Sequence, residues 1–226
     1  MGKKFELTDK FIINVFGIKL FQIKCTKSFK YAQKGDLGGY VEKEGNLDQE
    51  NDAWVYGNAQ VSGDAQVSGD AQVSGNARVY GDARVSGDAQ VSGNARVYGN
   101  VWVSGDARVS GDAQVSGNAW VYGNAQVYGD AQVSGNAWVY GNAQVYGDAN
   151  IKNNNEHCGF DGFGSCNRHT HAYLTKEKKV EITCGCFRGS IEEFEKKVEE
   201  THSGTIYEKQ YKAIINVIKI KFGLTD

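Results

Sequence analysis

Residues 76–93 read NARVYG-DARVSG-DAQVSG, three copies of a six-residue unit that repeats from Asn51 to Ile151. An aliphatic residue occupies every sixth position from Val55 to Ile151, which gives seventeen positions without a change of phase. A repeat this regular has to be interpreted before any local propensity.

The alternation within one unit indicates a short β-strand. Ala77 and Val79 would point to one side and Arg78 to the other, so the small and aliphatic residues form the inside. Gly81 accepts a positive φ and begins a corner. A strand this short cannot bury a core alone and must stack on its copies. The recurring glycine and valine disfavour a helix, and the unbroken phase disfavours disorder.

The repeat resembles that of the hexapeptide-repeat family, in which an aliphatic residue is followed four positions later by a small one, as Val85 is followed by Ala89. It departs from that family in having Ser or Tyr after the aliphatic residue. The resemblance implies a left-handed parallel β-helix with three hexads per coil, of between five and six coils. Residues eighteen apart then stack, roughly 4.8 Å apart along the axis.

Stacking sorts the outward residues into three faces, and one of them collects aromatic side chains. That face carries Gln66, Arg84, Trp102, Trp120 and Trp138, with Tyr122 and Tyr140 beside them. The others carry Trp54, Gln72, Gln90, Arg108, Gln126 and Gln144, and Gln60, Arg78, Arg96, Gln114, Gln132 and Asn150.

The aromatic residues are interpreted as a binding or oligomer interface, because Trp, Tyr and Arg dominate interface energetics. The predicted site comprises Arg84, Trp102, Trp120, Trp138, Tyr122 and Tyr140, with Arg78, Arg96, Tyr128 and Tyr146 as secondary candidates. The alternative is mutual stacking that only stiffens the ladder, worth ~1 kcal/mol per pair. Self-association as a trimer or dimer is expected, since hexapeptide-repeat proteins typically form trimers along such faces.

The Asp and Asn of each corner form an axial polar ladder. It could bind cations, as acidic β-roll repeats do. Because Asn interrupts the acids, these residues are interpreted as corner-formers that also add charge.

Composition limits the partners of this chain of 226 residues. The net charge of −2 provides no field that would recruit nucleic acid or a membrane surface. No signal peptide or apolar run long enough to cross a bilayer is visible, and five cysteines fit reduced thiols. A cytoplasmic protein is expected, in the host cytoplasm if phage-encoded.

The N-terminal fifty residues predict a β cap for the first coil. Phe11–Phe16 and Leu20–Cys25 read as strands of a hairpin around Gly17, and the glycines of Lys34–Val41 as a tight turn into the coil. An uncovered β-helix end would expose strand edges, so a cap is required. Lys34–Val41 and Asn46–Tyr56 resemble the start of YdcK-like hexapeptide-repeat proteins of bacteria and phages, for which no activity is firmly assigned.

The residues after Ile151 predict a polar linker and a small α+β module. His169–Thr175 and Lys179–Cys186 alternate as a hairpin, with Cys184 and Cys186 on one face and interpretable as core. Capping pairs Ser190/Glu193 and Thr205/Glu208 begin two helices, the second with Tyr207, Tyr211, Ile214, Ile218 and Phe222 inward and Gly223 at its end. Residues 185–194 resemble the closing segment of uncharacterised phage proteins.

Catalysis is not indicated by the repeat. All four histidines lie outside it, no loop interrupts it, and it contains no Thr ladder of the ice-binding kind. No cofactor is expected. No metal site is predicted, and Cys158, Cys166, His169 and His171 are only secondary candidates for one, because their spacings match no common zinc pattern.

The sequence therefore predicts a mainly β protein with an N-terminal β cap (1–50), a hexapeptide-repeat β-helix (51–151) and a C-terminal α+β module (152–226). We expect a non-catalytic binding or assembly protein, which the phage resemblance would make an inhibitor of a host defence protein or a sequestering protein. The alternative is an acyltransferase-like enzyme that uses His169 or His171 against a neighbouring subunit.

Overall fold

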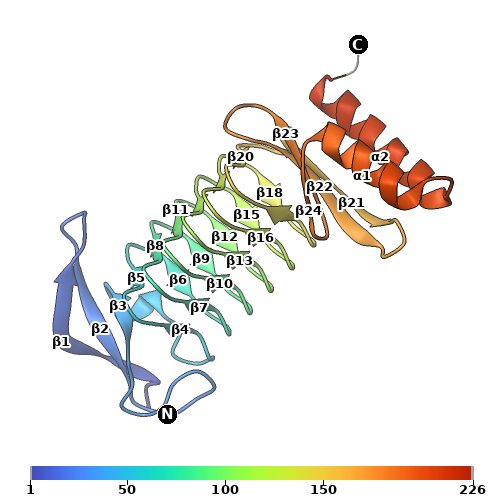
Figure 1. Cartoon of the computed structure of the whole chain (residues 1–226). Coiled ribbons are helices and arrows are strands. Elements are labelled where there is room, and N and C mark those ends of the chain that lie inside the picture. The colour runs from blue at the N-terminus through green and yellow to red at the C-terminus, as the bar shows by residue number, and fades with distance from the viewer. Residues whose placement is uncertain (1, 225–226) are drawn as a thin grey trace.

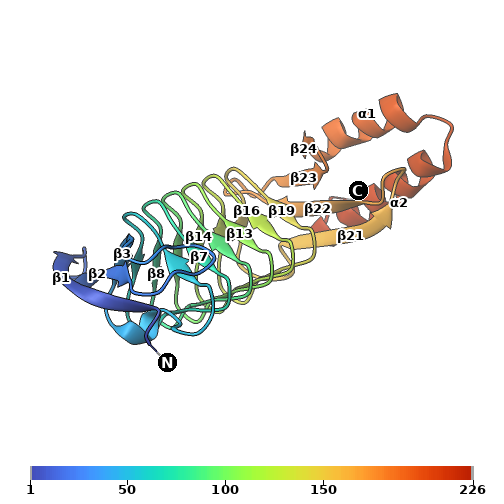
Figure 2. The same ribbon diagram turned by 90° about the horizontal axis from the view of Figure 1, so that it is seen from below.

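The computed structural model describes residues 2–224 as one elongated molecule in which three parts follow one another along an axis (Figure 1). Antiparallel strands lie at the N-terminal end, a parallel β-solenoid forms the middle, and a sheet with two helices lies at the other end. The view from below shows the coils of the solenoid stacked between these two ends (Figure 2).

The solenoid strands pair with a constant offset of eighteen residues, so that Val85 pairs with Val103 and Val103 with Val121. This offset confirms three hexads per coil. The solenoid has about six turns, because the six-stranded sheet on one of its faces receives one strand from each turn. Its strands are β4 (Trp54–Val55), β7 (Gln72–Val73), β10 (Gln90–Val91), β13 (Arg108–Val109), β16 (Gln126–Val127) and β19 (Gln144–Val145).

The other two faces follow the same offset. The five-stranded sheet contains β6 (Gln66–Val67), β9 (Arg84–Val85), β12 (Trp102–Val103), β15 (Trp120–Val121) and β18 (Trp138–Val139). The nine-stranded sheet contains β5 (Gln60–Val61), β8 (Arg78–Tyr80), β11 (Arg96–Tyr98), β14 (Gln114–Val115), β17 (Gln132–Val133) and β20 (Asn150–Ile151), preceded by β1, β2 and β3.

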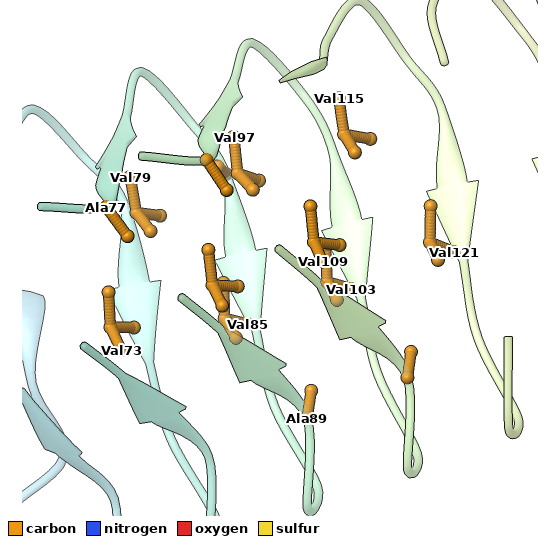
Figure 3. Packing of buried hydrophobic residues seen from close by; sticks show 14 of the residues in the cluster. Val73, Ala77, Val79, Val85, Ala89, Val97, Val103, Val109, Val115 and Val121 are labelled. Atoms are coloured by element: carbon orange, nitrogen blue, oxygen red, sulfur yellow. The ribbon is translucent and has the colours of Figure 1, made fainter. Parts of the chain in front are cut away.

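The core is a column of the repeat's aliphatic and small residues. Valines such as Val79, Val97 and Val115 follow one another along the axis with no exposed surface (Figure 3). Val101 stands where the other units have alanine and is equally buried. The alternation of inward and outward residues predicted for each hexad is therefore confirmed.

The corners need glycine for two reasons. Gly87 has a φ of 67°, a left-handed conformation that other residues seldom adopt. A Cβ on Gly87 would also lie 2.9 Å from the backbone nitrogen of Gly105 in the next coil. Because successive coils are this close at most corners, the glycine of the repeat allows the coils to stack without a clash.

Polar side chains connect successive coils just after these glycines. The Asn76 Nδ2 amide donates to Asn94 Oδ1 at 3.2 Å, and Asn94 Nδ2 donates to Asp112 Oδ1 at 3.0 Å. The corner residues thus hydrogen bond along the axis, in agreement with their interpretation as corner-formers.

The N-terminal strands continue the nine-stranded sheet beyond the first coil. β1 (Phe5–Ile13) pairs antiparallel with β2 (Lys19–Cys25), β2 pairs antiparallel with β3 (Leu37–Val41), and β3 pairs parallel with β5. The predicted hairpin around Gly17 is present, although its first strand begins earlier than expected. A 3₁₀ turn, η1 (Glu44–Asn46), follows β3.

Trp54 points outward as its position in the hexad predicts, but the expectation that an outward tryptophan faces solvent is wrong at this residue. Its indole is only 1% exposed, because Phe5 and Phe29 pack edge-on against it with ring centroids 6.4 and 5.4 Å away. Trp54 does point away from the coil, but the N-terminal segment covers it.

The C-terminal part is a four-stranded antiparallel sheet packed against two helices. The predicted hairpin corresponds to β22 (Arg168–Leu174) and β23 (Val180–Cys184). β21 (His157–Phe163) and β24 (Phe187–Gly189) flank it and were not predicted. Cys186 is exposed while Cys184 is buried, so the two do not share a core face, because the chain turns at Gly185.

The helices begin where the capping pairs predicted. In α1 (Ile191–His202), the Ser190 hydroxyl accepts from the Glu193 N–H, and α2 (Ile206–Phe222) ends at Gly223 with a φ of 67°. Tyr211, Ile214 and Ile218 are buried as expected. Ile215 is also buried, whereas Tyr207 and Phe222 are only partly covered.

Candidate functional site

The predicted aromatic residues form one continuous surface along the five-stranded sheet. Here the name aromatic face denotes Arg84, Trp102, Trp120, Trp138, Tyr122 and Tyr140. Its strands β9, β12, β15 and β18 lie in a row along the solenoid (Figure 1). The parallel offset of eighteen residues brings together side chains that are far apart in the sequence.

The indoles of the aromatic face stack on one another. The ring centroids of Trp102 and Trp120 are 4.9 Å apart and those of Trp120 and Trp138 are 5.5 Å apart. The Arg84 guanidinium lies over the Trp102 ring at 5.1 Å, a cation–π contact that continues the stack. Tyr122 and Tyr140 form a parallel stack at 5.5 Å.

Stacking does not remove these rings from solvent. The exposed fractions are 40% for Trp102, 37% for Trp120, 44% for Trp138 and 52% for Tyr140. A contiguous apolar surface of this kind is uncommon unless something binds there. The face is therefore rigid and still available for contact.

The secondary candidates lie on the other two sheets. Tyr128 and Tyr146 stack at 5.3 Å beside the six-stranded sheet. Arg78 and Arg96 pair on the nine-stranded sheet, next to the stacked rings of Tyr80 and Tyr98. The Tyr80–Tyr98 stack was not singled out from the sequence, although their spacing of eighteen residues is the signal that reveals it.

A pocket of about 350 Å³ lies at the C-terminal end of the aromatic face. Trp138 and Tyr140 of the last coil form one side, and His157, His169 and Lys221 of the C-terminal module form much of the other. The Trp138 N–H donates to Asn154 Oδ1 at 2.8 Å, which ties the last strand of the face to the segment entering the module.

The histidines in this pocket are largely withdrawn from water. Burial, with a smaller contribution from Lys221, lowers the pKa of His157 to about 4. Burial lowers the pKa of His171 well below its usual value, and the neighbouring His157 acts in the same direction. Both rings are therefore neutral at pH 7. The ring of His169 donates from Nδ1 to Asp161 Oδ1 at 2.7 Å.

Among the described residues, neither cysteine of the secondary metal candidates forms a ready-made metal-binding group with these histidines, although Cys158 also lines the pocket. Cys158 is on the opposite face of β21, packed against the helical core, and burial raises the pKa of its thiol to about 11. Cys166 is exposed in the turn between β21 and β22. The residue that lies beside His169 and His171 in the structure is instead His157, which the spacing in the sequence did not select.

A comparison with known families matches the solenoid to one of them. Residues 65–167 match the sequence model of the bactofilin family, described as polymer-forming cytoskeletal. The match omits the N-terminal strands and both helices and covers less than half of the chain. No curated protein matches this chain significantly.

The match bears on several of the predictions. Bactofilins are described as polymer-forming, which agrees with the prediction that this chain is not an enzyme. A mainly β solenoid and a non-catalytic assembly protein are likewise supported. The match gives no support to the YdcK-like or phage resemblance or to a host-defence role. Within residues 2–224, no helix is sufficiently long and apolar to span a bilayer.

Proposed function

We propose that this protein is a non-catalytic scaffold that assembles with copies of itself through the aromatic face. The observation that carries the proposal is the stack of three indoles, each more than a third exposed, on the solenoid that resembles a polymer-forming family. Tryptophan is enriched among the residues whose truncation most weakens protein interfaces.

Residues of the N-terminal segment already hydrogen bond to backbone groups of the first coil, which leaves few of these groups free to pair with a second solenoid. Strands β3, β2 and β1 continue the nine-stranded sheet beyond the first coil. The Lys4 ammonium donates to the Ala53 carbonyl at 2.9 Å above the six-stranded sheet. The Asn46 amide donates to the Ala65 carbonyl at 2.8 Å above the five-stranded sheet. We infer that these residues act as the N-terminal cap.

The last coil is covered in a similar way. The Lys176 N–H donates to the Asp148 carbonyl at 2.9 Å, and the Thr183 hydroxyl donates to the Gln144 carbonyl at 3.0 Å. Because other parts of the chain cover both ends of the solenoid, lateral association of two solenoids is favoured over end-to-end stacking. A dimer or trimer built on the aromatic face would be the first step of assembly.

The outer edge of β1 is the competing assembly surface. Ile13 is 58% exposed, and Val15 and Phe16 at the hairpin tip are exposed as well. An exposed strand edge of this kind can pair with another chain. It lacks the stacked indoles of the aromatic face, so we place the primary contact on the aromatic face.

Replacing Trp102, Trp120 and Trp138 together with Ser tests the proposal. Sedimentation velocity and electron microscopy should show assemblies for the wild type and monomers for the variant. A matched control replaces Gln90, Arg108 and Gln126, which occupy equivalent positions on the six-stranded sheet, with Ser and should still assemble. If the tryptophan variant assembles normally and Ile13→Lys does not, the β1 edge carries assembly and the proposal is wrong.

Several finer expectations belong to the same proposal. We propose left-handed winding of the coils, the three-part division at residues 50 and 151, and a cytoplasmic location. Arg78, Arg96, Tyr128 and Tyr146 would serve as secondary contacts. A host protein as partner rests on the phage resemblance alone, and a pull-down from a bacterial lysate with the tryptophan variant as control tests it.

A further inference from the structure

Three histidines meet where the C-terminal sheet packs on the last coil. Alternation along β21 and β22 places His157, His169 and His171 on the sheet face that points toward the solenoid. His157 Nδ1 and His171 Nε2 are 3.0 Å apart. The His169 ring lies over Gly159, where a Cβ would be only 2.7 Å from its Nε2 atom, so the glycine makes room for this ring.

The outer nitrogen of each ring faces an oxygen that can only accept a hydrogen bond. His169 Nδ1 faces Asp161 Oδ1 at 2.7 Å, His157 Nε2 faces Asn154 Oδ1 at 3.3 Å, and His171 Nδ1 faces the Gln144 carbonyl at 3.4 Å. The orientation of the Asn154 amide is fixed, because the same Oδ1 atom accepts the Trp138 N–H. With the protons on the outer nitrogens, each ring presents a lone pair from its inner nitrogen.

These inner nitrogens lack a suitable partner. His169 Nε2 is buried, and no hydrogen-bond partner for it exists among the described residues, while its side chain is only 8% exposed. Two lone pairs 3.0 Å apart repel unless a proton or a cation lies between them. Two imidazole nitrogens that each lie about 2.0–2.1 Å from a tetrahedral zinc ion are about 3.3 Å apart, close to the separation of His157 and His171.

We propose that His157, His169 and His171 bind one divalent transition-metal ion of the zinc type. A histidine ligand that donates its other N–H to a carboxylate, carbonyl or amide oxygen is the usual arrangement at protein metal sites. Imidazole nitrogens are ligands suited to zinc and its neighbours in the transition series.

Metal binding requires a movement of His169. Among residues 2–224, no three His, Cys, Asp or Glu side chains already converge on one point as in a loaded site. The His169 ring is the one that has to turn toward the other two, and the adjacent pocket of about 350 Å³ provides space for this movement and for a fourth ligand.

The ion would act as a structural clasp. His157 and His171 are connected through Asn154 and Gln144 to the last strands of the solenoid, so an ion held by β21 and β22 would strengthen the attachment of the module to the coil. This role is independent of the aromatic face and does not require catalysis.

Titration of the metal-stripped protein with Co²⁺, followed by visible absorption and by elemental analysis after dialysis against Zn²⁺, tests the proposal. One ion per chain is expected, together with a higher midpoint of thermal unfolding. His157→Gln and His169→Asn should each weaken binding at least tenfold. His202→Gln is the matched control, because His202 packs on Tyr211 away from this pocket, and it should bind as the wild type does.

The opposite results would overturn the proposal. No stoichiometric ion in the wild type would mean that a His171–His157 hydrogen bond fills the space between the rings. Equal losses in His202→Gln and His157→Gln would indicate adventitious surface binding. Should the histidine variants lose their native circular dichroism, Asp161→Asn decides. The Asp161 carboxylate is largely exposed, and its loss should weaken binding about 10–100-fold, so unchanged affinity would contradict the site.

Discussion

The indole of Trp120 lies parallel to that of Trp102, with an angle of 4° between the ring planes and 4.9 Å between their centroids. The two residues are eighteen positions apart, and the pairing of β12 with β15 places them directly opposite one another. The pairing of these two parallel strands therefore sets the separation of the rings.

Replacing Trp120 with Phe should abolish the coupling between indoles, because Trp120 is the middle ring and contacts both others. We expect the exciton couplet in circular dichroism to disappear and the free energy of unfolding to fall by about 1 kcal/mol. In Trp102→Phe the Trp120–Trp138 pair remains, so part of the couplet should persist. An unchanged spectrum in Trp120→Phe would show that the rings are not stacked in solution.

Replacing Trp54 with Ala should destabilise the protein by about 3–5 kcal/mol, since its buried indole fills the space beneath Phe5 and Phe29. Urea unfolding measures this loss. Trp138→Ala removes an indole that is 44% exposed and should cost clearly less. Equal losses in the two variants would contradict the difference in burial.

Gly39→Ala should destabilise the first coil by about 1–3 kcal/mol. A Cβ at this position would lie 2.7 Å from both the Ala59 carbonyl oxygen and Val55 Cγ1, and the backbone atom cannot easily move. Gly45→Ala is the control, because nothing lies within 4 Å of a Cβ there. Thermal unfolding of both variants checks the prediction, and a neutral Gly39→Ala would show that β3 lies farther from the coil.

Tyr173→Phe should loosen the attachment of the C-terminal module. The Tyr173 hydroxyl donates to Glu181 Oε1 at 2.5 Å and accepts the Tyr146 N–H at 3.3 Å, and losing it leaves a partly buried N–H unpaired, at a cost of about 1 kcal/mol. Hydrogen exchange should become faster at the Tyr146 amide and across β22. The Tyr128 amide bonds to the Val145 carbonyl and should be unaffected. If exchange at the Tyr146 amide stays slow in the variant, the hydrogen bond to the Tyr173 hydroxyl does not hold the module to the solenoid.

Local sequence was enough to predict the solenoid and the helix starts. The six-residue period identifies the inward valines and alanines, and Ser190 with Glu193 marks the first turn of α1, because each pattern depends on neighbouring residues or on one fixed repeat. The aromatic stack followed from the same period. The covered position of Trp54 did not, since Phe5 and Phe29 reach it from segments with no repeat.

By itself, the sequence determined the corner of each hexad, the side that is buried, and the residues that stack along each face. It could do so because every unit of a strict repeat adopts the same local conformation. Only the tertiary structure decided what lies at the two ends. The burial of Trp54, the meeting of His157 with His171 and the bond from Trp138 to Asn154 depend on segments that fold back from outside the repeat. Such contacts are set by packing between non-repeating parts of the chain, and no period in the sequence encodes them.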